Sequence, residues 1–382
     1  MTNPGMDSPQ IRLVVIQASP FCNINCRYCY LPHRSSRSLM EERVLRKIYE
    51  RLFSSGYLAE VVSLCWHAGE PLTVPIEFYR RATAILTQFN RDRIRVEQYI
   101  QTNAMLITQD WCDLFQALGM HVSVSIDGPQ WLHDTHRLTR NGHGTFERAM
   151  RGVKLLQENG IPFYNIAVLT EDSLDHPDEI WQFFVSEGFE KLAFNLEEIE
   201  GSNTRGTIRF PRDIARYQAF FRRLREMRTT CSRSVVVREL DEMDERIRST
   251  CGETLCTLNS PLATMSFDCE GNMSTFSPEL LAARPSMYDL RFGNVFTSTV
   301  GDVLACTAFQ AAHDDIQLGV QRCRDLCPYF SVCGGGAPSN KLAENGTFDS
   351  TETTNCRFTI QALCDLVLDD VEESLGITID HP

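Results

Sequence analysis

The stretch IRLVVIQASPFCNINCRYCY, residues 11–30, joins an apolar segment directly to a polar loop that holds three cysteines. The apolar part has the composition of a buried β-strand. Cys22, Cys26 and Cys29 follow it with the spacing Cys-x3-Cys-x2-Cys. One short loop can thereby wrap three thiolates around a single centre, whereas unrelated buried cysteines seldom reach this density. The stretch predicts a strand that leads into a metal or iron–sulfur site.

Two kinds of centre suit the three thiols. A structural zinc ion takes four ligands, and His33, four residues after Cys29, is a conceivable fourth. No other cysteine or histidine lies nearby at a usual zinc spacing. A four-iron cluster held by three cysteines instead leaves one iron open, and an open iron can bind a substrate or cofactor.

Composition and charge narrow the classes of function. The chain has 382 residues, 43% of them hydrophobic and 23% charged, which suits one large or two medium globular domains. Its 50 acidic and 37 basic residues give a net charge of −13, so nucleic acid is a poor partner. Neither a signal peptide nor an apolar run of membrane-spanning length is visible, so we expect a cytoplasmic protein with no membrane partner. There, 15 cysteines favour metal or redox chemistry over disulfides.

Outward from the first strand, strand and helix patterns alternate as far as residue 229. We expect strands at 11–17, 61–67, 95–101, 120–126, 164–170 and 191–197. We expect helices at 40–54, 76–91, 108–118, 144–159, 176–187 and 211–229. Six such units imply an α/β fold with parallel strands and right-handed crossovers, in an open sheet or a full or partial barrel. Ligands then gather at the C-terminal ends of the strands.

The pattern changes near residue 250, where short segments rich in Cys, Gly, Ser, Thr and Pro begin. We therefore expect a barrel domain at 10–245 and a second domain at 246–382. The loops of the second domain are expected to be held by something other than a large apolar core. An amphipathic helix at about 359–375 should close the chain.

The three-cysteine loop after the first strand resembles the cluster loop of the radical S-adenosylmethionine (SAM) enzymes. The resemblance implies a partial (β/α)6 TIM-like barrel and a [4Fe-4S] cluster on Cys22, Cys26 and Cys29. The open iron of that cluster would bind SAM, and cleavage of SAM would give a 5′-deoxyadenosyl radical that abstracts hydrogen from a substrate. An external electron donor such as flavodoxin or ferredoxin would reduce the cluster.

Further matches to this family fall at the ends of the next strands. WHAGEPL, residues 66–72, resembles its Gly-Gly-Glu-Pro motif with Ala68 at the first glycine, so Gly69 and Glu70 would hold the amino group of SAM. The alternative for Glu70 is a solvated loop residue. The resemblance also suggests contacts to SAM or substrate from Tyr28, Gln101, Asn103, Ser125, Asp127, Arg137 and Leu169. Among these, Asp127 has the alternative of capping a turn with Gly128.

The cysteines of the tail suit a second centre. Four of them, Cys323, Cys327, Cys333 and Cys356, fit either zinc or an iron–sulfur cluster. Beside a radical SAM barrel they resemble the SPASM extension, an iron–sulfur domain that normally binds two auxiliary four-iron clusters through seven cysteines. Phe276 and Ala337 stand where that pattern has cysteines. We therefore expect one auxiliary cluster on the four tail cysteines; a second, on Cys251, Cys256 and Cys269, stays open, with its absence favoured.

The tail also bears on the reaction. Sulfatase maturases place an aspartate as base just after the second auxiliary cysteine, and this chain has Ser277 there. The runs 275–280 and 329–363 look most like the maturases that build cyclophanes in glycine-rich-repeat precursor peptides. This implies a ribosomal precursor peptide as substrate and a carbon–carbon bond between an aromatic ring carbon and a side-chain β-carbon. Glu279 is a conceivable proton acceptor, although a surface carboxylate is the favoured interpretation.

Three alternatives remain. Two are enzymatic: an oxidation of the anaerobic sulfatase maturase kind, and thioether formation or epimerisation of a peptide. The third belongs to another class, a zinc-stabilised peptide-binding module without radical chemistry.

Overall fold

The computed structural model describes residues 9–249, 256–281 and 288–376, whose strands form one ten-stranded sheet in the order β10-β9-β8-β1-β2-β3-β4-β5-β6-β7. The first seven strands are all parallel to their neighbours. Their bounds are β1 Ile11–Ile16, β2 Leu58–Trp66, β3 Arg95–Thr102, β4 His121–Val124, β5 Phe163–Leu169, β6 Lys191–Leu196 and β7 Val236–Val237. The expected mostly parallel α/β fold is confirmed, and each of the six expected strands lies within three residues of its expected bounds.

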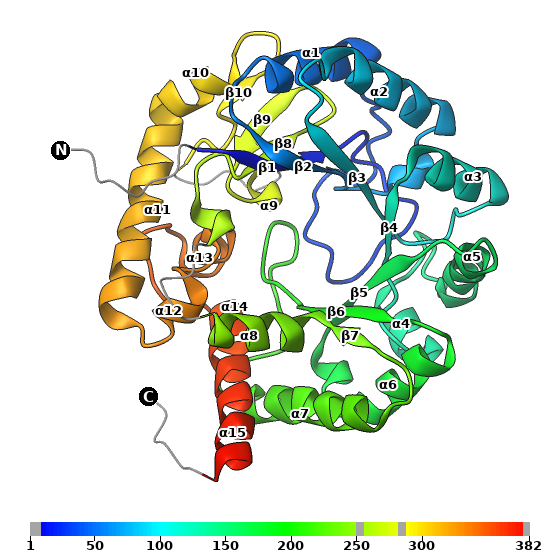
Figure 1. Ribbon diagram of the computed structural model, residues 1–382, viewed down its shortest axis with the longest axis vertical. Helices are drawn as coiled ribbons and strands as arrows, with labels where there is room; N and C mark the ends of the chain where they lie inside the picture. Colours follow the sequence, from blue (N-terminus) through cyan, green and yellow to red (C-terminus); the bar gives the residue numbers. More distant parts are fainter. Residues whose placement is uncertain (1–8, 250–255, 282–287, 377–382) are drawn as a thin grey trace.

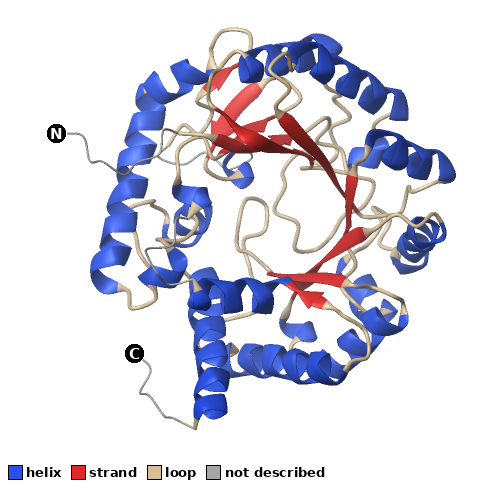
Figure 2. Cartoon of the chain, viewed as in Figure 1, coloured by secondary structure: helices blue, strands red, loops and turns tan. Residues whose placement is uncertain are grey.

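Helices cover the outer face of this curved row of strands (Figures 1 and 2). They are α1 Glu42–Phe53, α2 Ile76–Phe89, α3 Gln109–Leu118, α4 Gln130–His136, α5 Phe146–Glu158, α6 Pro177–Ser186, α7 Ile214–Thr230 and α8 Arg238–Arg248. In α2, for example, Phe78, Ala82, Ile85 and Leu86 recur every three or four residues and are buried against the sheet. The six expected helices are present, and the short α4 and α8 are found in addition to them.

The C-terminal part continues the same sheet. Strand β8, Thr264–Phe267, pairs in parallel with β1, and β9, Asn272–Thr275, and β10, Gly293–Asn294, follow as antiparallel strands. The expected boundary at 245/246 falls inside α8. Since β1 has partners on both sides, the second part is an extension of the barrel sheet rather than a separately built layer.

The expectation of short segments without a large core was wrong for this part. Helix α11 runs from Thr307 to Leu326, and its Phe309 and Ile316 are buried in the same apolar cluster as the barrel. Phe276, at one of the cysteine positions of the tail pattern, is fully buried and stacks on Phe309 with ring centroids 5.6 Å apart. Apolar packing therefore holds much of this region.

The remaining helices lie in the tail: α9 Pro278–Leu281, α10 Val300–Ala305, α12 Phe330–Cys333, α13 Pro338–Asn345, α14 Thr354–Cys356 and α15 Leu363–Leu375. A π-helical turn, Arg357–Ala362, leads into α15, so the expected closing helix is present. Helix α15 packs against α7 and α8 (Figure 1). No described helix is both long and apolar enough to cross a membrane.

Candidate active site

The loop after β1 places Cys22, Cys26 and Cys29, the three-thiol loop, at the C-terminal end of the sheet. Its backbone is fixed from outside: the Cys22 amide donates to Arg34 O at 3.1 Å, and Arg140 donates to Cys22 O at 2.8 and 3.0 Å. Burial, the Glu70 carboxylate and the two other thiols raise the pKa of Cys22 to about 12. Burial likewise raises that of Cys26 to about 11.

These pKa values describe the donor set. Three thiols close enough to disfavour one another's ionisation, in a partly buried loop, need a strongly cationic centre before they can ionise together. Iron supplies such a charge, so the residues present fit a cluster with three thiolate ligands. In the described ranges, no group of three or more His, Cys, Asp and Glu side chains is arranged to hold one metal ion.

The turn after β2 buries a carboxylate beside this loop. Ala68 and Gly69 have φ values of 67° and 136°, and a Cβ at Gly69 would lie 2.5 Å from Ser19 O. Only glycine tolerates that approach, and it lets Glu70 enter the core at 2% exposure. The solvated-loop interpretation of Glu70 is therefore wrong.

Glu70 is held by three protein donors. It accepts hydrogen bonds from Leu72 N at 3.0 Å, Thr102 Oγ1 at 2.7 Å and Asn103 N at 2.8 Å. Burial raises its pKa to about 7, although these hydrogen bonds act in the opposite direction. A buried carboxyl group whose pKa lies near neutrality is stabilised in its ionised form by a cationic partner, and the ammonium group of an amino acid is such a partner.

Polar residues from β3 and β4 meet beside the same loop. The Asn103 side chain donates to Asn23 Oδ1 at 2.7 Å and lies 4.0 Å from Cys22 Sγ. Gln101 Nε2 donates to Ser125 Oγ at 2.7 Å. The structure thus places Asn103 beside the three-thiol loop and pairs Gln101 with Ser125.

Asp127 and Arg137 lie close by but occupy each other. Arg137 Nε and Nη2 reach the two carboxylate oxygens at 3.0 Å, and both side chains are buried. Tyr28 Oη and the Val168 amide also donate to Asp127, at 2.5 and 3.0 Å. Burial opposes ionisation of Asp127, but Arg137 outweighs it and lowers the pKa. Leu169 follows at the end of β5, 1% exposed.

A second cysteine-rich site lies in the tail. A cavity of about 250 Å³ is lined by five cysteines, Cys256, Cys323, Cys327, Cys333 and Cys356. We name this site the tail cysteine pocket. Burial raises the pKa of Cys333 to about 11 and that of Cys356 to about 12, and neighbouring thiols add to both shifts. The four expected cysteines therefore converge, and the structure adds Cys256 to them.

Cys256 and Cys269 do not share a site. Cys269 lines a separate cavity of about 600 Å³, together with Gln17 and Ala68 at the ends of β1 and β2. The expected alternative of a second auxiliary cluster on Cys251, Cys256 and Cys269 is not assembled, because Cys256 and Cys269 line different cavities. Cys251 lies outside the described residues.

Sequence reasoning missed two acidic residues at the end of β6. Glu198 lines the tail cysteine pocket, and Glu200 is 7% exposed. Their one sequence signal is position, since they follow a strand within the run KLAFNLEEIE, residues 191–200. Glu279, expected at the surface, is only partly exposed and lies 3.4 Å from Tyr30 Oη.

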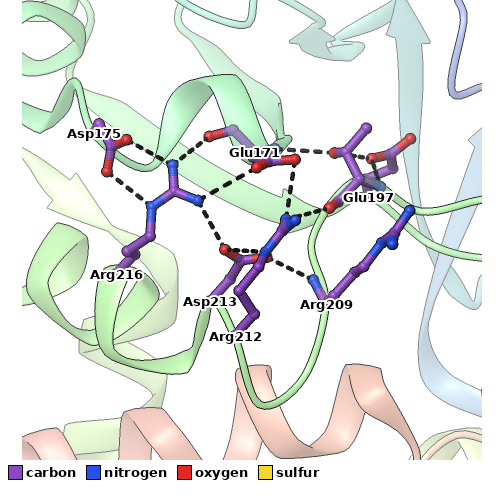
Figure 3. A network of polar contacts seen from close by, with 8 residues as sticks. Glu171, Asp175, Glu197, Arg209, Arg212, Asp213 and Arg216 are labelled. Atoms are coloured by element: carbon purple, nitrogen blue, oxygen red, sulfur yellow. Dashed lines mark hydrogen bonds and ion pairs between the residues drawn. The ribbon is translucent and has the colours of Figure 1, made fainter.

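The segment that follows these two glutamates is anchored by an arginine network, Glu171, Asp175, Arg212, Asp213 and Arg216. Figure 3 shows Arg212 and Arg216 converging on Asp213, each at 2.7 Å. Arg216 also binds Asp175 at 2.6 Å, and Thr207 N donates to Glu197 Oε2 at 2.8 Å. The network fixes the far end of the loop that begins at Glu197.

Comparison with known proteins decides the family. Residues 16–184 match the radical SAM superfamily. The chain belongs to the radical SAM superfamily. Membership implies a [4Fe-4S] cluster and SAM as cofactors, as the three-thiol loop led us to expect.

Relatives of this radical SAM protein differ in how far they extend along it. An uncharacterized protein of Synechocystis sp. (strain PCC 6803) is 42% identical over 96% of this chain and 93% of its own length. The serine-type anaerobic sulfatase-maturating enzyme of Bacteroides thetaiotaomicron is 32% identical over 43% of this chain, which is 40% of that enzyme. Likeness to the sulfatase-maturating enzyme therefore covers less than half of either protein.

Solved structures share the fold over nearly the whole chain. The anSMEcpe protein with bound AdoMet superposes with a TM-score of 0.78 at 19% identity, covering 95% of this chain and 99% of that one. Streptococcus suis SuiB bound to its precursor peptide SuiA gives 0.65 at 16% identity, covering 91% and 76%. At these identities the likeness establishes the fold alone.

Proposed function

We propose that this radical SAM protein is a peptide maturase that forms a carbon–carbon crosslink, a three-residue cyclophane, in a ribosomally made precursor peptide. The observation that carries the proposal is the tail cysteine pocket, a second thiol-lined site besides the three-thiol loop. A crosslink removes two hydrogens from the peptide, so its formation needs an electron acceptor after the hydrogen abstraction. An auxiliary iron–sulfur cluster in that pocket suits this task.

The three-thiol loop is proposed to hold the [4Fe-4S] cluster that binds SAM. Together they supply the 5′-deoxyadenosyl radical. Glu70 would accept hydrogen bonds from the SAM amino group, and the backbone at Gly69 would pass beside it. The proposed lining of the SAM and substrate cavity comprises Tyr28, Gln101, Asn103, Ser125, Asp127, Arg137 and Leu169. Asp127 and Arg137 act in it as a pair, since each neutralises the other.

The tail cysteine pocket is proposed to hold one auxiliary [4Fe-4S] cluster through Cys323, Cys327, Cys333 and Cys356. Lys341 is 4% exposed and donates to Cys323 Sγ at 3.4 Å, a cation placed to stabilise a thiolate. Cys256 Sγ lies 3.7 Å from Gly336 O at the same cavity. Reduction by an external flavodoxin or ferredoxin and a cytoplasmic location complete the proposal.

The cavity of about 600 Å³ is the proposed place for the peptide. It opens at the ends of β1, β2 and β8, where Gln17, Ala68 and Ser266 line it. It also touches Gly201 and Pro278, which border the segments from the barrel and from the tail. Streptococcus suis SuiB, which shares the fold, has been solved bound to a precursor peptide, and this supports a peptide as the class of substrate.

Oxidation of a sulfatase is the second candidate, favoured by the partial likeness to sulfatase-maturating enzymes. Ser277 argues against it, because a serine hydroxyl is a poor base at neutral pH. Its Oγ donates to the Glu279 carboxylate. The crosslinking reaction therefore fits these residues better.

Mass spectrometry of a co-expressed precursor peptide tests the proposal. We expect a loss of two hydrogens that maps to one short motif with an aromatic residue. Cys26→Ala should abolish both this loss and the formation of 5′-deoxyadenosine. Cys112→Ala, at a buried cysteine of α3 outside both cysteine sites, is the matched control and should retain both. An unchanged precursor mass, or activity on a sulfatase peptide instead, contradicts the crosslinking proposal.

Iron and sulfide analysis separates the two proposed clusters. Anaerobically reconstituted protein should contain roughly eight irons per chain, and Cys333→Ala should lower this to roughly four. Cys26→Ala should retain the signal of the auxiliary cluster in electron paramagnetic resonance. If Cys333→Ala leaves the iron content unchanged, the tail cysteine pocket holds no cluster, and the zinc alternative is tested by metal analysis of the same sample.

A further inference from the structure

Three carboxylates gather between the two cysteine sites. Glu198 and Glu200 follow β6, and Glu279 lies on α9 beyond β9. We name them the carboxylate trio. They come from segments about 80 residues apart in sequence, yet Glu279 raises the pKa of both of the others, so the three groups face one another.

The trio contacts both proposed cluster sites through neighbouring residues. Tyr30, the residue after Cys29, donates to Glu279 Oε1 at 3.4 Å. On the other side, the side-chain amide of Asn355, the residue before Cys356, donates to Glu198 Oε1 at 3.0 Å, and Asn340 does so at 3.2 Å. Glu198 itself lines the tail cysteine pocket. The trio therefore spans the distance between the two sites.

No arginine or lysine neutralises the trio within the described ranges. None of its members takes part in an ion pair there, unlike Asp127 and Asp213. Glu200 is only 7% exposed, and its Oε2 atom is buried without a hydrogen-bond partner. His67 Nδ1, at the end of β2 and near Glu279, is also buried without a partner. Two polar atoms without partners in one buried site point to a group that arrives with the substrate.

The pKa values of Glu198 and Glu200 agree with this geometry. Burial, with Glu279 next, raises the pKa of Glu198 to about 7. Burial, Glu279 and Glu198 together raise that of Glu200 to about 9. Glu198, whose pKa lies near neutrality, exchanges protons readily at the pH of the cell, whereas Glu200 holds its proton there.

We propose that Glu279 is the proton acceptor of the crosslinking reaction, with Glu198 as the residue to which it passes the proton. This inference rests on the proposed function. After the β-hydrogen has left as an atom, the β-carbon forms a bond to the aromatic ring carbon. That ring carbon then loses its hydrogen as a proton to Glu279. To regain its aromaticity the ring must also lose one electron, and an iron–sulfur cluster held by the tail cysteine pocket would be the one-electron oxidant.

The position of the trio explains why a proton and an electron can leave together. The proton enters a carboxylate that is hydrogen-bonded to Ser277, whose Oγ is 3.3 Å from Ser339 Oγ. The electron leaves toward cysteines that Glu198 adjoins.

Product ratios test the assignment. In Glu279→Gln the ratio of crosslinked peptide to 5′-deoxyadenosine should fall at least tenfold, while 5′-deoxyadenosine formation and iron content stay at the wild-type level. Glu198→Gln should lower the same ratio by a smaller factor. The control, Glu179→Gln, removes an exposed carboxylate of α6 that binds His176 and should leave the ratio unchanged.

The outcomes separate this inference from the function on which it rests. If the wild type forms no crosslink, the proposed function fails. If the wild type forms it and both glutamine variants keep the wild-type ratio, the inference fails while the function stands. Should Glu279→Gln lose iron through misfolding, Glu198→Gln decides the same question.

Infrared spectroscopy gives a readout that needs neither cofactor nor substrate. The wild type at pH 8, above the pKa of about 7 of Glu70 and Glu198, should show the band of the protonated Glu200 carboxyl group, and Glu200→Gln should remove most of it. Glu179→Gln should retain the band. A wild-type spectrum without any such band would contradict shared protons in the trio.

Discussion

The arginine network and the carboxylate trio are two groups of acidic side chains that differ in whether arginine pairs with them. In the arginine network, Asp213 is fully buried but receives Arg212, Arg216 and the Arg209 amide (Figure 3). Burial alone would raise its pKa, yet these donors lower it to about 2. In the carboxylate trio no cation from residues 9–249, 256–281 or 288–376 forms an ion pair that would offset the burial, and the pKa of Glu200 rises to about 9.

The difference shows how one strand end can carry both a structural and a reactive set of acids. A paired carboxylate stays ionised and holds the chain in place. An unpaired buried carboxylate costs stability at neutral pH, and such a cost is typical of functional sites. The predictions below either remove a partner from a paired acid or remove the charge from an unpaired one.

The largest effect is expected where a buried acid loses its only arginine. Arg137→Met leaves Asp127 buried without a cation and should lower the free energy of unfolding by about 3–5 kcal/mol. Urea denaturation under anaerobic conditions measures it. The double variant Asp127→Asn with Arg137→Met should recover much of the loss, because it leaves no charge behind. A loss below about 1 kcal/mol in the single variant would show that pairing is not what keeps Asp127 ionised.

Removing the unpaired charge should stabilise the protein. Glu200 binds its proton more tightly in the folded state, so folding stability is highest below pH 4.5 and falls as the pH rises toward 9. Glu200→Gln should remove this dependence and raise the free energy of unfolding at pH 7 by about 2–3 kcal/mol. At pH 4 the two proteins should unfold alike. A variant that is less stable at both pH values would contradict an ionisation penalty at this residue.

Asp213 should show the opposite pH dependence. Its pKa is lowered from 3.8 to about 2, so the stability it contributes is present above pH 4 and is lost as the pH falls toward 2. Asp213→Asn should therefore cost about 2 kcal/mol at pH 7 and almost nothing at pH 2. Denaturation curves at the two pH values measure the difference. An equal cost at both would mean that shape, and not charge, is what the arginines recognise.

The smallest effect is expected for a paired acid in water. Arg223 binds Asp178 at 2.6 Å, but both side chains are nearly half exposed. Arg223→Ala should change the free energy of unfolding by about 0.5 kcal/mol or less, and salt should reduce the change further. A larger effect would mean that pairing matters as much at the surface as in the core, which would undo the contrast between the two groups.

Local signals predicted most of the barrel. Apolar alternation and helix end signals such as Gly119, which adopts φ 61°, gave each expected strand and helix of the barrel to within a few residues. The three-thiol loop was equally local, because its three cysteines lie within eight residues. Gly69 and Glu70 were found through a short motif, although their burial was not.

Long-range pairing could not be predicted from such signals. The placement of β8 beside β1 and of Cys256 beside Cys333 depends on contacts between distant segments. Glu198 and Glu200 look like any acidic loop residues, since their character comes from the absence of a nearby arginine in the described part of the chain. Helix α11 was overlooked because Cys323 and several polar residues interrupt its apolar pattern.

The pairing of β8 with β1 has a practical consequence. A chain ended at residue 245 would lose β8 and leave the backbone N–H and C=O groups of Leu13 to Ile16 without their partners on that side. An apolar strand with a bare edge recruits other chains, so such a fragment should aggregate rather than remain in solution as a shortened protein. The tail therefore covers the β1 edge of the barrel sheet, independent of any cofactor that it holds.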